Sequence, residues 1–281
     1  MPNVDLIAPT RRRCCALADD VPRGSSWEFH WGDSSFDDAA DGRSGDDTGV
    51  LVAAPARTGA ASVVGVGKVY RTATEQVNAL VDVSKDFPRG RITAIAGPSG
   101  SGKTSLLRIL ACVDRPSAGS VLIEGGVVAS LRVRQRRALR RSSVSYMFQN
   151  PIDNLLDYLP ACDQVHLASR LRGIRTGRDE EQRLLGVLGL DHRLRHKPHQ
   201  LSGGEQQRLA VACAVIGHPA IVIADEPTAE LDSAAADRVL EAFRDLRTEG
   251  VAFVISSHDP RVVAVADHLL RLDHGRVVES T

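Results

Sequence analysis

Long apolar runs are missing from this 281-residue sequence. A membrane-spanning helix needs roughly 18 consecutive apolar residues, and the best candidate, residues 209–216, is far shorter and directly follows Arg208. A secretory signal is not predicted either, because Arg11, Arg12 and Arg13 lead into polar sequence and not into an apolar core. These absences argue against a membrane-spanning or exported chain and predict a cytoplasmic one.

Cysteine is sparse and does not occur in pairs of the kind that bind metal. The five cysteines form no C-x-x-C pair and show no metal-ligand spacing. They are Cys14, Cys15, Cys112, Cys162 and Cys213. An odd and scattered set predicts reduced thiols in a cytoplasm.

Excess charge of either sign is also lacking, since 35 Lys and Arg residues balance 35 Asp and Glu residues. A neutral chain has no overall basic field that would recruit nucleic acid or an anionic membrane, so no nucleic-acid partner is expected. One basic run covers every side of a predicted helix without interleaved aromatics, which favours a solvated surface over a nucleic-acid patch. Its members are Arg132, Arg134, Arg136, Arg137, Arg140 and Arg141.

Residues 1–60 differ in composition from the rest of the chain. They contain ten acidic residues, six arginines and no lysine, and Gly, Ser and Asp crowd between Gly24 and Gly49. Such a segment buries too little apolar surface to fold. We predict a disordered acidic tail over residues 1–60 and a folded domain over residues 61–281. Scattered aromatics in the tail leave a docking motif open as an alternative.

Residues 97–104 read Gly-Pro-Ser-Gly-Ser-Gly-Lys-Thr, which fits a phosphate-binding loop. An apolar strand-like run, residues 92–96, precedes them, and apolar residues at helical spacing follow. The glycines let backbone N–H groups face an anion at the positive end of the helix. The chemistry predicts that Lys103 reaches the β and γ phosphates and that Thr104 offers its hydroxyl to Mg²⁺. The predicted binding residues here are Gly97, Pro98, Ser99, Gly100, Ser101, Gly102, Lys103, Thr104 and Ser105, the last of which also fits an ordinary helix surface.

Two adjacent carboxylates end a second apolar strand. Residues 221–224 are apolar, and Asp225 and Glu226 follow at once. Acids at the end of a buried strand are costly unless they act on something. We predict that Asp225 holds Mg²⁺ through its water shell and that Glu226 polarises the water that attacks the γ-phosphate; the alternative is that the pair only begins a loop.

Two further strand-like runs end in polar residues. His258 follows residues 251–256 and is placed to hydrogen-bond a γ-phosphate or the attacking water. Gln149 follows residues 144–148, where a polar side chain can face a ligand. Each residue is weak evidence alone, and we keep both as candidate catalytic residues.

Residues 201–208, Leu-Ser-Gly-Gly-Glu-Gln-Gln-Arg, open a predicted helix. Ser202 stands at the N-cap and Glu205 three residues later, which is the arrangement of a capping box. Capping does not require Gly203 and Gly204, which leave a bare helix N-terminus able to receive a phosphate.

The remaining patterns predict the surrounding structure. Residues 63–66 are typical of an edge strand, and Tyr70 after them could stack on a purine or fill a half-buried core position. Residues 154–199 have a helical pattern. Residues 269–272 and 277–278 predict a hairpin around Gly275.

Together these motifs resemble, over residues 62–281, the nucleotide-binding subunit of an ABC transporter, because six elements occur in the family's order. They are Tyr70, residues 97–104, Gln149, residues 201–208, Asp225 with Glu226, and His258. The resemblance implies an α/β P-loop NTPase with an ABC-type core of mainly parallel sheet, an N-terminal antiparallel β subdomain and a helical subdomain at about 150–205.

The same resemblance implies an ATPase that uses ATP and Mg²⁺ and works as a head-to-tail dimer. Each ATP then lies between residues 97–104 of one protomer and Ser202, Gly203, Gly204 and Glu205 of the other. Tyr70 is implied to stack on adenine and Gln149 to join Thr104 and Asp225 at the metal. Lys103, Gln149, Glu226 and His258 are the implied catalytic residues.

Several segments resemble the subgroup that drives lipoprotein release and macrolide export. They are Tyr70, residues 79–80, 114–116, 148–149, 154–156 and 224–228. Members of that subgroup pair with a separate permease, so we expect a homo- or heterodimer on the inner face of the cell membrane. Residues 229–232 and the pair Ser256-Ser257 depart from the subgroup's pattern.

Two other functions stay open at this point. One is a soluble ABC-type ATPase that acts on DNA or ribosomes; such proteins usually carry a second cassette, a long coiled coil or zinc-binding cysteines, and none is present here. The other is a regulator that senses ATP without hydrolysing it. Glu226 and His258 argue against a sensor, which needs neither residue.

Overall fold

The computed structural model describes residues 59–71 and 75–281. The acidic tail predicted for residues 1–60 lies outside the described residues except for its last two. Ala60 is fully buried, and its amide donates to the carbonyl of Phe87 at 3.0 Å. The folded part therefore includes at least the residue before the predicted boundary at 61.

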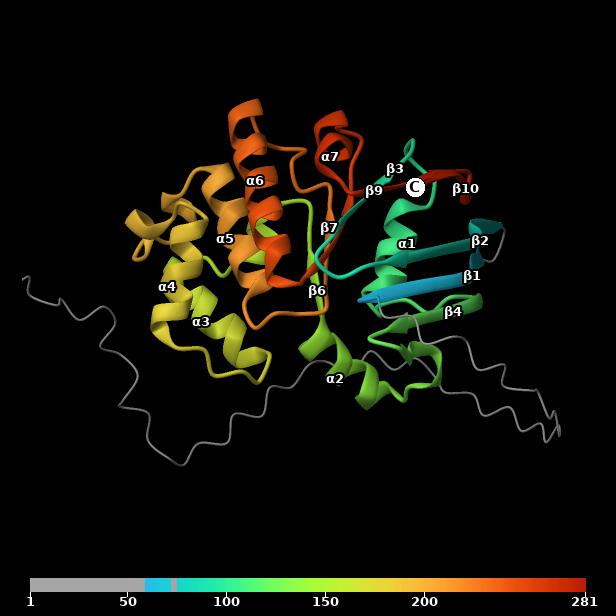
Figure 1. Cartoon of the computed structure of the whole chain (residues 1–281), viewed down its shortest axis with the longest axis horizontal. Coiled ribbons are helices and arrows are strands. Elements are labelled where there is room, and N and C mark those ends of the chain that lie inside the picture. Colours follow the sequence, from blue (N-terminus) through green and yellow to red (C-terminus); the bar gives the residue numbers. More distant parts are fainter. Residues whose placement is uncertain (1–58, 72–74) are drawn as a thin grey trace, which may run out of the picture. The chain divides into compact units, whose positions relative to one another are not determined.

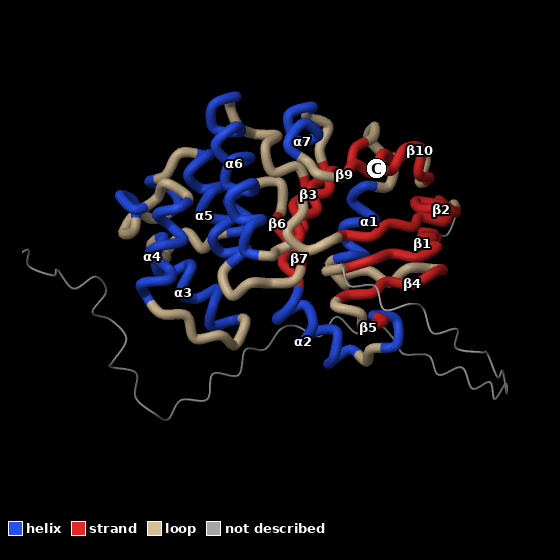
Figure 2. The backbone as a smooth tube through the Cα atoms, viewed as in Figure 1, coloured by secondary structure: helices blue, strands red, loops and turns tan. Residues whose placement is uncertain are grey.

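A six-stranded sheet in the order β10-β9-β3-β8-β7-β6 forms one layer (Figures 1 and 2). Five of its strands are parallel, and β10 pairs antiparallel with β9 at one edge. Apolar, nearly fully buried sequences such as that of β3 are expected for parallel strands covered on both faces. The bounds are β3 Ile92–Ala96, β6 Val144–Met147, β7 Ile221–Asp225, β8 Ala252–Ser256, β9 His268–Asp273 and β10 Arg276–Ser280.

A second, antiparallel sheet has the order β2-β1-β4-β5. Its strands are β1 Ala61–Arg71, β2 Gln76–Phe87, β4 Ala118–Ile123 and β5 Gly126–Val127. The prediction of an edge strand at residues 63–66 is wrong, because β1 pairs with β2 on one side and with β4 on the other. Register shifts between Val63 and Val66 interrupt the regular alternation of the strand, so the sequence pattern looks shorter and weaker than the strand is.

Helix α1, Lys103–Leu110, connects the two sheets, since it contacts β1 and β2 as well as β7 and β8. Leu106, Leu107, Ile109 and Leu110 are all buried to 1% exposure or less. Burying each such side chain contributes about 1.5–3 kcal/mol. One continuous apolar core therefore runs from the antiparallel sheet through α1 to the parallel sheet.

Most of the remaining helices lie on the β6 side of the molecule, and the last of them packs on β3 (Figure 1). They are α2 Val133–Ser143, α3 Ala161–Leu171, α4 Arg178–Val187, α5 Gly203–Val215, α6 Ser233–Leu246 and α7 Pro260–Val265, with short 3₁₀ turns between them. Helices α3 and α4 lie between β6 and β7 in the chain and pack on α5. The predicted combination of mainly parallel sheet, antiparallel sheet and helical region is confirmed. The boundaries at about 150 and 205 stay a prediction.

The predicted hairpin is confirmed as β9 and β10. Its turn places His274 at φ 44° and Gly275 at φ 75°, as a two-residue type I′ connection requires. The amide of Gly275 donates to the carbonyl of Ser101 at 3.0 Å, and its carbonyl accepts from Val81 at 2.8 Å. The C-terminal hairpin is thus tied both to the glycine-rich loop after β3 and to β2.

Two negative findings apply to the described part of the chain. No helix there is long and apolar enough to cross a membrane. The three cysteines in the described ranges, Cys112, Cys162 and Cys213, are free thiols.

Asp267 fixes the start of the β3–β9 pairing. Its amide donates to the carbonyl of Ile92 at 2.8 Å, and its carboxylate accepts from the Ile92 amide at 2.9 Å and from Arg247 at 2.9 Å. Arg91 adds a third donor at 3.1 Å. Burial alone would raise the pKa of Asp267, but these donors outweigh burial and lower it.

We therefore expect Asp267→Asn to lower the free energy of unfolding by about 1–3 kcal/mol at pH 7. A carboxyl whose pKa is lower in the folded state stabilises the fold above its unfolded pKa of about 3.9, and this stabilisation is lost as the pH falls. The difference between variant and parent should thus narrow below about pH 4. Urea unfolding at several pH values measures it, with the exposed Asp245→Asn as control. An equal loss in both variants would contradict the assignment.

Candidate functional site

The carboxyl ends of three neighbouring parallel strands meet at one edge of the sheet. Strand β8 lies between β3 and β7, with Ser256 opposite Ile95 on one side and opposite Asp225 on the other. The loops that follow these strands therefore start side by side, as ligand-binding loops do in parallel sheets.

These loops enclose a cavity of about 550 Å³. Its lining combines the glycine-rich loop and the first residues of α1 with one residue after β7, one after β8, three residues of β2 and one of the β9–β10 turn. The members are Val77, Asn78, Ala79, Gly97, Pro98, Ser99, Gly100, Gly102, Lys103, Thr104, Ser105, Glu226, His258 and His274. The sequence-predicted residues from 97 to 105, apart from the buried Ser101, thus share one cavity with Glu226 and His258.

Two glycines of the loop occupy positions that only glycine fits. Gly97 has φ +147°, and a Cβ added there would lie 2.1 Å from the carbonyl oxygen of Leu272. Gly102 has φ +101°, and its Cβ would lie 2.4 Å from the carbonyl oxygen of Ala79. The loop therefore passes against the β9–β10 hairpin and β2 with no room for a side chain, which fixes its path around the cavity.

The amine of Lys103 is held inside this loop. Its Nζ donates to the carbonyls of Gly97 at 2.8 Å and Pro98 at 3.0 Å, and the residue is only 9% exposed. Gly102 caps α1 without a side-chain hydrogen bond, so the first amides of the helix are unsatisfied by a cap. A buried cation beside a bare helix N-terminus is an anion site.

The same loop leaves room for that anion. A Cβ added at Gly100 would meet no atom within 4 Å, and the hydroxyl of Ser101 is buried without a hydrogen-bond partner in the described structure. The side chain of Thr104 is exposed at the cavity. These features fit a polyphosphate with its metal ion. The Thr104 hydroxyl and the Asp225 carboxylate, described next, are enough protein ligands for Mg²⁺ when phosphate oxygens supply others.

Asp225 is held just behind the cavity wall. Its carboxylate accepts from Ser256 Oγ at 2.5 Å and from the hydroxyl of Tyr146 at 3.2 Å. Burial, reinforced by the Asp225 carboxylate, raises the pKa of Tyr146, so this hydroxyl stays a donor. Sequence reasoning missed both partners. The serine at the end of β8 and the tyrosine in β6 carry no motif, and only strand order places them beside Asp225.

Glu226 and His258 face each other across the cavity edge. His258 Nδ1 lies 2.7 Å from Glu226 Oε2, and the Glu226 side chain is 20% exposed. Glu226 has φ 48°, an unusual conformation for a residue with a side chain. Its amide donates to the carbonyl of Ser256 at 3.0 Å, which holds this conformation. The carboxylate is thereby turned toward the cavity and fixed by its histidine partner.

Tyr70 and Gln149 are among the predicted residues that do not line the cavity. Tyr70 at the end of β1 is 39% exposed, and its hydroxyl donates to Asp114 at 3.1 Å and lies 3.4 Å from Ser105 Oγ. Because Ser105 does line the cavity, Tyr70 stands at its rim. Gln149 is exposed just after β6, one strand beyond β7, and has no contact with the cavity.

The segment from Ser202 to Glu205 also lies outside this cavity. Its capping box is confirmed, since Glu205 N donates to Ser202 Oγ at 3.3 Å and Ser202 N donates to Glu205 Oε2 at 2.8 Å. Gly204 has a packing role as well, because a Cβ there would lie 2.8 Å from Ala235 Cβ on α6. Ser202 and Gly203 stay exposed at the helix start. They are available to a ligand held by another chain.

Sequence reasoning also missed cavity residues that carry no chemical signature. Val77, Asn78 and Ala79 come from the start of β2, and His274 comes from the hairpin turn. The hairpin itself was predictable from Gly275, but its contact with the loop after β3 spans more than 170 residues of chain. No local pattern reports such a contact.

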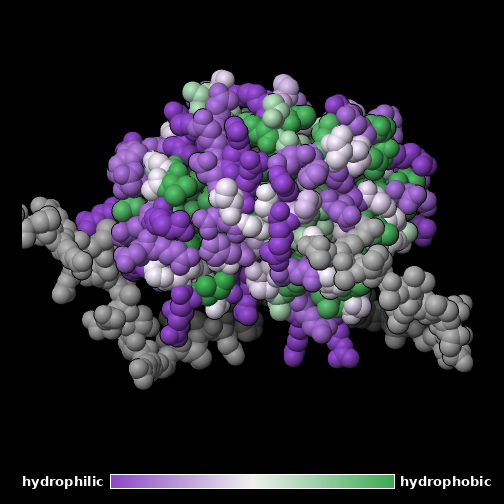
Figure 3. Space-filling view, in the orientation of Figure 1, coloured by the Kyte–Doolittle hydropathy of each residue, from purple (hydrophilic) through white to green (hydrophobic). Residues whose placement is uncertain are grey.

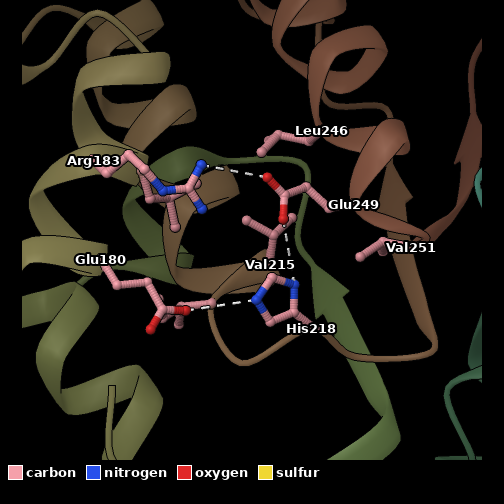
Figure 4. A pocket seen from close by; sticks show the side chains of 9 residues that line it. Glu180, Arg183, Val215, His218, Leu246, Glu249 and Val251 are labelled. Carbon is pink, nitrogen blue, oxygen red and sulfur yellow. Dashed lines mark ion pairs between the residues drawn. The ribbon is translucent and has the colours of Figure 1, made fainter. Parts of the chain in front are cut away.

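A much smaller apolar cavity lies between α4 and the ends of α5 and α6 (Figure 4). His218 reaches Glu180 at 3.5 Å on one side and Glu249 at 3.7 Å on the other, and Arg183 also pairs with Glu249. The space, about 20 Å³, is close to that of a single water molecule. The ion pairs around this cavity join α4 to the segments that follow α5 and α6. The cavity itself is too small for an organic ligand.

Comparison with known families gives one clear result. Residues 80–229 match the family model described as "ABC transporter". This match covers more than half of the chain and includes the loop of residues 97–104, the capping-box segment and Asp225 with Glu226.

Individual relatives match over three quarters of the chain. A lipoprotein-releasing system ATP-binding protein LolD from Bordetella pertussis is 41% identical over 75% of this chain and 92% of its own length. A macrolide export ATP-binding/permease protein MacB 1/2 from Paracoccus denitrificans is 40% identical over 76% of this chain. The chain spans only 32% of that larger relative.

Solved structures match in the same way. A dimeric ATP-binding cassette in a post-hydrolysis state with ADP and Pi superposes with a TM-score of 0.69 and 32% identity, covering 79% of this chain and 97% of that one. The structure of cbiO1 from Clostridium perfringens, part of the ABC transporter complex cbiONQ, gives a TM-score of 0.70 at 25% identity, covering 80% of this chain and 88% of that one.

Gly97 and Gly100, two glycines of the loop, provide a direct test of the cavity geometry. We expect Gly97→Ala to lower the free energy of unfolding by about 2–4 kcal/mol, because the new methyl group meets a backbone oxygen and the local backbone must move. Gly100→Ala, which also has positive φ but open space, should cost only about 1–2 kcal/mol. Urea unfolding of both variants measures the difference. Similar losses would show that Gly97 is not confined as described.

Proposed function

Because this chain belongs to the ABC transporter family, we propose that it is the ATP-hydrolysing subunit of a transporter whose membrane-spanning permease is a separate chain. ATP binding and hydrolysis, with Mg²⁺, are properties of the family's cassettes, and the chain is an ATPase of this type. The observation that carries the proposal is the cavity in which the loop of residues 97–104 meets Glu226 and His258.

The loop and α1 bind the phosphates in this proposal. The uncapped amides at the start of α1 and the amine of Lys103 face the anion, and Lys103 exchanges its contacts with the Gly97 and Pro98 carbonyls for phosphate oxygens. Thr104 and Asp225 are the residues that would hold Mg²⁺, with Gln149 as the third candidate from the sequence. When bound, the ion neutralises charge on the phosphate oxygens.

Glu226 orients and polarises the attacking water. Its carboxylate lies at the cavity and its backbone conformation is fixed through Ser256. His258 Nδ1, 2.7 Å from Glu226, keeps one carboxylate oxygen in place. When both ring nitrogens carry a proton, His258 donates one N–H to Glu226 and the other to the γ-phosphate. Tyr70 at the rim is our candidate for stacking on the adenine ring.

The active site is completed by a second protomer in this proposal. Ser202 and Gly203 are exposed at the start of α5, Gly204 is buried and Glu205 is half-buried, and all four lie outside the cavity of their own chain. A head-to-tail dimer lets this helix N-terminus meet the γ-phosphate that the other chain holds. A dimeric cassette among the similar structures supports this arrangement.

The partner in the membrane is proposed from the relatives. The LolD and MacB proteins suggest a permease of the lipoprotein-release or macrolide-export type, which would place this chain on the inner face of the cell membrane. No observation favours a soluble ATPase acting on DNA or ribosomes, or an ATP sensor.

We expect Lys103→Ala to weaken ATP binding at least tenfold and to abolish turnover, because it removes the cation inside the loop. Glu226→Gln should keep binding but lower hydrolysis by roughly 10²–10⁴-fold, since only the water-orienting charge is lost. Nucleotide-binding and phosphate-release assays separate the two effects. The exposed neighbour Glu230→Gln is the matched control. Hydrolysis by Glu226→Gln at the control's rate would remove Glu226 from the mechanism.

Mixed dimers test whether each site is shared. Pairing a Lys103→Ala chain with a Ser202→Arg chain should leave one intact site, while pairing wild type with the double variant should leave none. Differently tagged chains, purified as ATP-bound heterodimers and checked by size, are assayed for phosphate release. Activity in the second pairing and silence in the first would mean that each chain is self-sufficient.

A further inference from the structure

The six arginines at residues 132–141 have no role in the proposed ATPase site. Five of them lie within α2, Val133–Ser143, and Arg132 is its N-cap. Helix α2 leads directly into the start of β6, so it lies at the amino ends of the parallel strands. The ATP cavity lies at their carboxyl ends. This arginine surface, which we call the α2 face, is therefore remote from the ATP chemistry.

The α2 face carries unbalanced positive charge. Within residues 59–71 and 75–281, none of the α2 arginines forms an ion pair with a carboxylate. Glu124, which accepts a hydrogen bond from Ser143 at the end of α2, is already paired with Arg89. In Figure 3, hydrophilic side chains project from the surface where Figure 1 draws α2.

Positive charge is densest around Arg136, which has the guanidinium groups of Arg115 and Arg140 as neighbours. Its Nε is buried without a hydrogen-bond partner in the described structure. Burial, together with the guanidinium groups of Arg115 and Arg140, lowers the pKa of Arg136. These three guanidinium groups repel one another, and no carboxylate in the described part of the chain neutralises them. A bound anion would reduce this repulsion, so the surface favours anion binding. Arg140 has a structural role besides, since it donates to the carbonyl of Cys112 at 2.8 Å.

Apolar side chains are interspersed with these cations. Val113, Val127 and Val133 are 51%, 41% and 50% exposed. Val113 lies in the loop after α1, next to Cys112, which Arg140 contacts; Val127 ends β5, just before the 3₁₀ turn that leads to α2; and Val133 is the first residue of α2. Aromatic side chains, on which nucleic-acid bases would stack, are absent from residues 112–145. Arginines mixed with exposed aliphatic groups suit a lipid headgroup layer better than a nucleic acid.

We propose that the α2 face binds the anionic phospholipid surface of the membrane. The inference rests on the proposed function in one respect, since a permease would bring this chain to a membrane. Arg115, Arg132, Arg134, Arg137 and Arg141 are all exposed and provide the headgroup contacts. Each arginine near an anionic bilayer contributes about 1 kcal/mol. The valines add shallow apolar contact, and the cassette gains a direct lipid contact in addition to its permease.

Vesicle co-sedimentation of the full chain tests this proposal. We expect binding to phosphatidylglycerol vesicles, little binding to phosphatidylcholine vesicles, and loss of binding as salt is raised. The triple variant Arg134→Gln, Arg137→Gln, Arg141→Gln should bind at least tenfold more weakly, given about 1 kcal/mol for each arginine. A matched control with the same change of charge replaces three exposed arginines elsewhere, Arg175, Arg238 and Arg244, by glutamine and should bind like the parent.

Three outcomes would overturn the proposal. They are absence of parent binding to anionic vesicles, an equal loss in the control variant, and tighter binding of the α2 face to a DNA or RNA oligonucleotide than to vesicles. ATP hydrolysis without vesicles is measured for every variant and should stay within about twofold of the parent, because α2 lies at the opposite strand ends. A parent chain that bound vesicles but hydrolysed no ATP would refute the proposed function and leave the lipid contact standing.

Discussion

The pairing of β3, β8 and β7 in parallel is the constraint on which the rest of the structure depends. Hydrogen bonds between these strands set Ile95, Ser256 and Asp225 level with one another. The functional residues begin one or two positions after the end of each strand, at Gly97, Glu226 and His258. A glycine-rich loop, a carboxylate pair and a histidine come together although they are separated by about 30 to 160 residues of chain. Moving any one strand by a single residue would also turn each of its side chains to the opposite face of the sheet and displace the loop that follows it.

Sequence reasoning reached the motifs of the site but not their supports. The loop of residues 97–104, Glu226 and His258 each follow an apolar run, and strand ends are visible in a single sequence. The hydrogen bonds that hold Asp225 come from Tyr146 and Ser256, which are ordinary residues in their own strands. Ser256 belongs to a pair that departs from the subgroup's pattern. The structure gives it the function of joining Asp225 to the backbone of Glu226.

The fold was predicted correctly where apolar residues follow a regular pattern, and the prediction was wrong where that pattern is interrupted. Five parallel strands and the β9–β10 hairpin have clear apolar runs or a clear turn residue. Strand β1 pairs on both sides, yet its bulges break the alternation on which such a prediction depends. Gly204 illustrates a different limit. The sequence suggests a phosphate-binding glycine, and the structure adds that α6 packs too closely there for any side chain.

The contact of the β9–β10 hairpin with the glycine-rich loop also affects how the protein folds during synthesis. Both sheet neighbours of β3 lie in the last 30 residues of the chain, and the Gly275 amide that holds Ser101 lies there too. A growing polypeptide therefore exposes the nucleotide loop to the cell long before the residues that shape it leave the ribosome. Contacts of such sequence separation form late in folding. A nascent chain would therefore gain its capacity to hold ATP only after residues 252–275 have been synthesised and have joined the sheet and the loop.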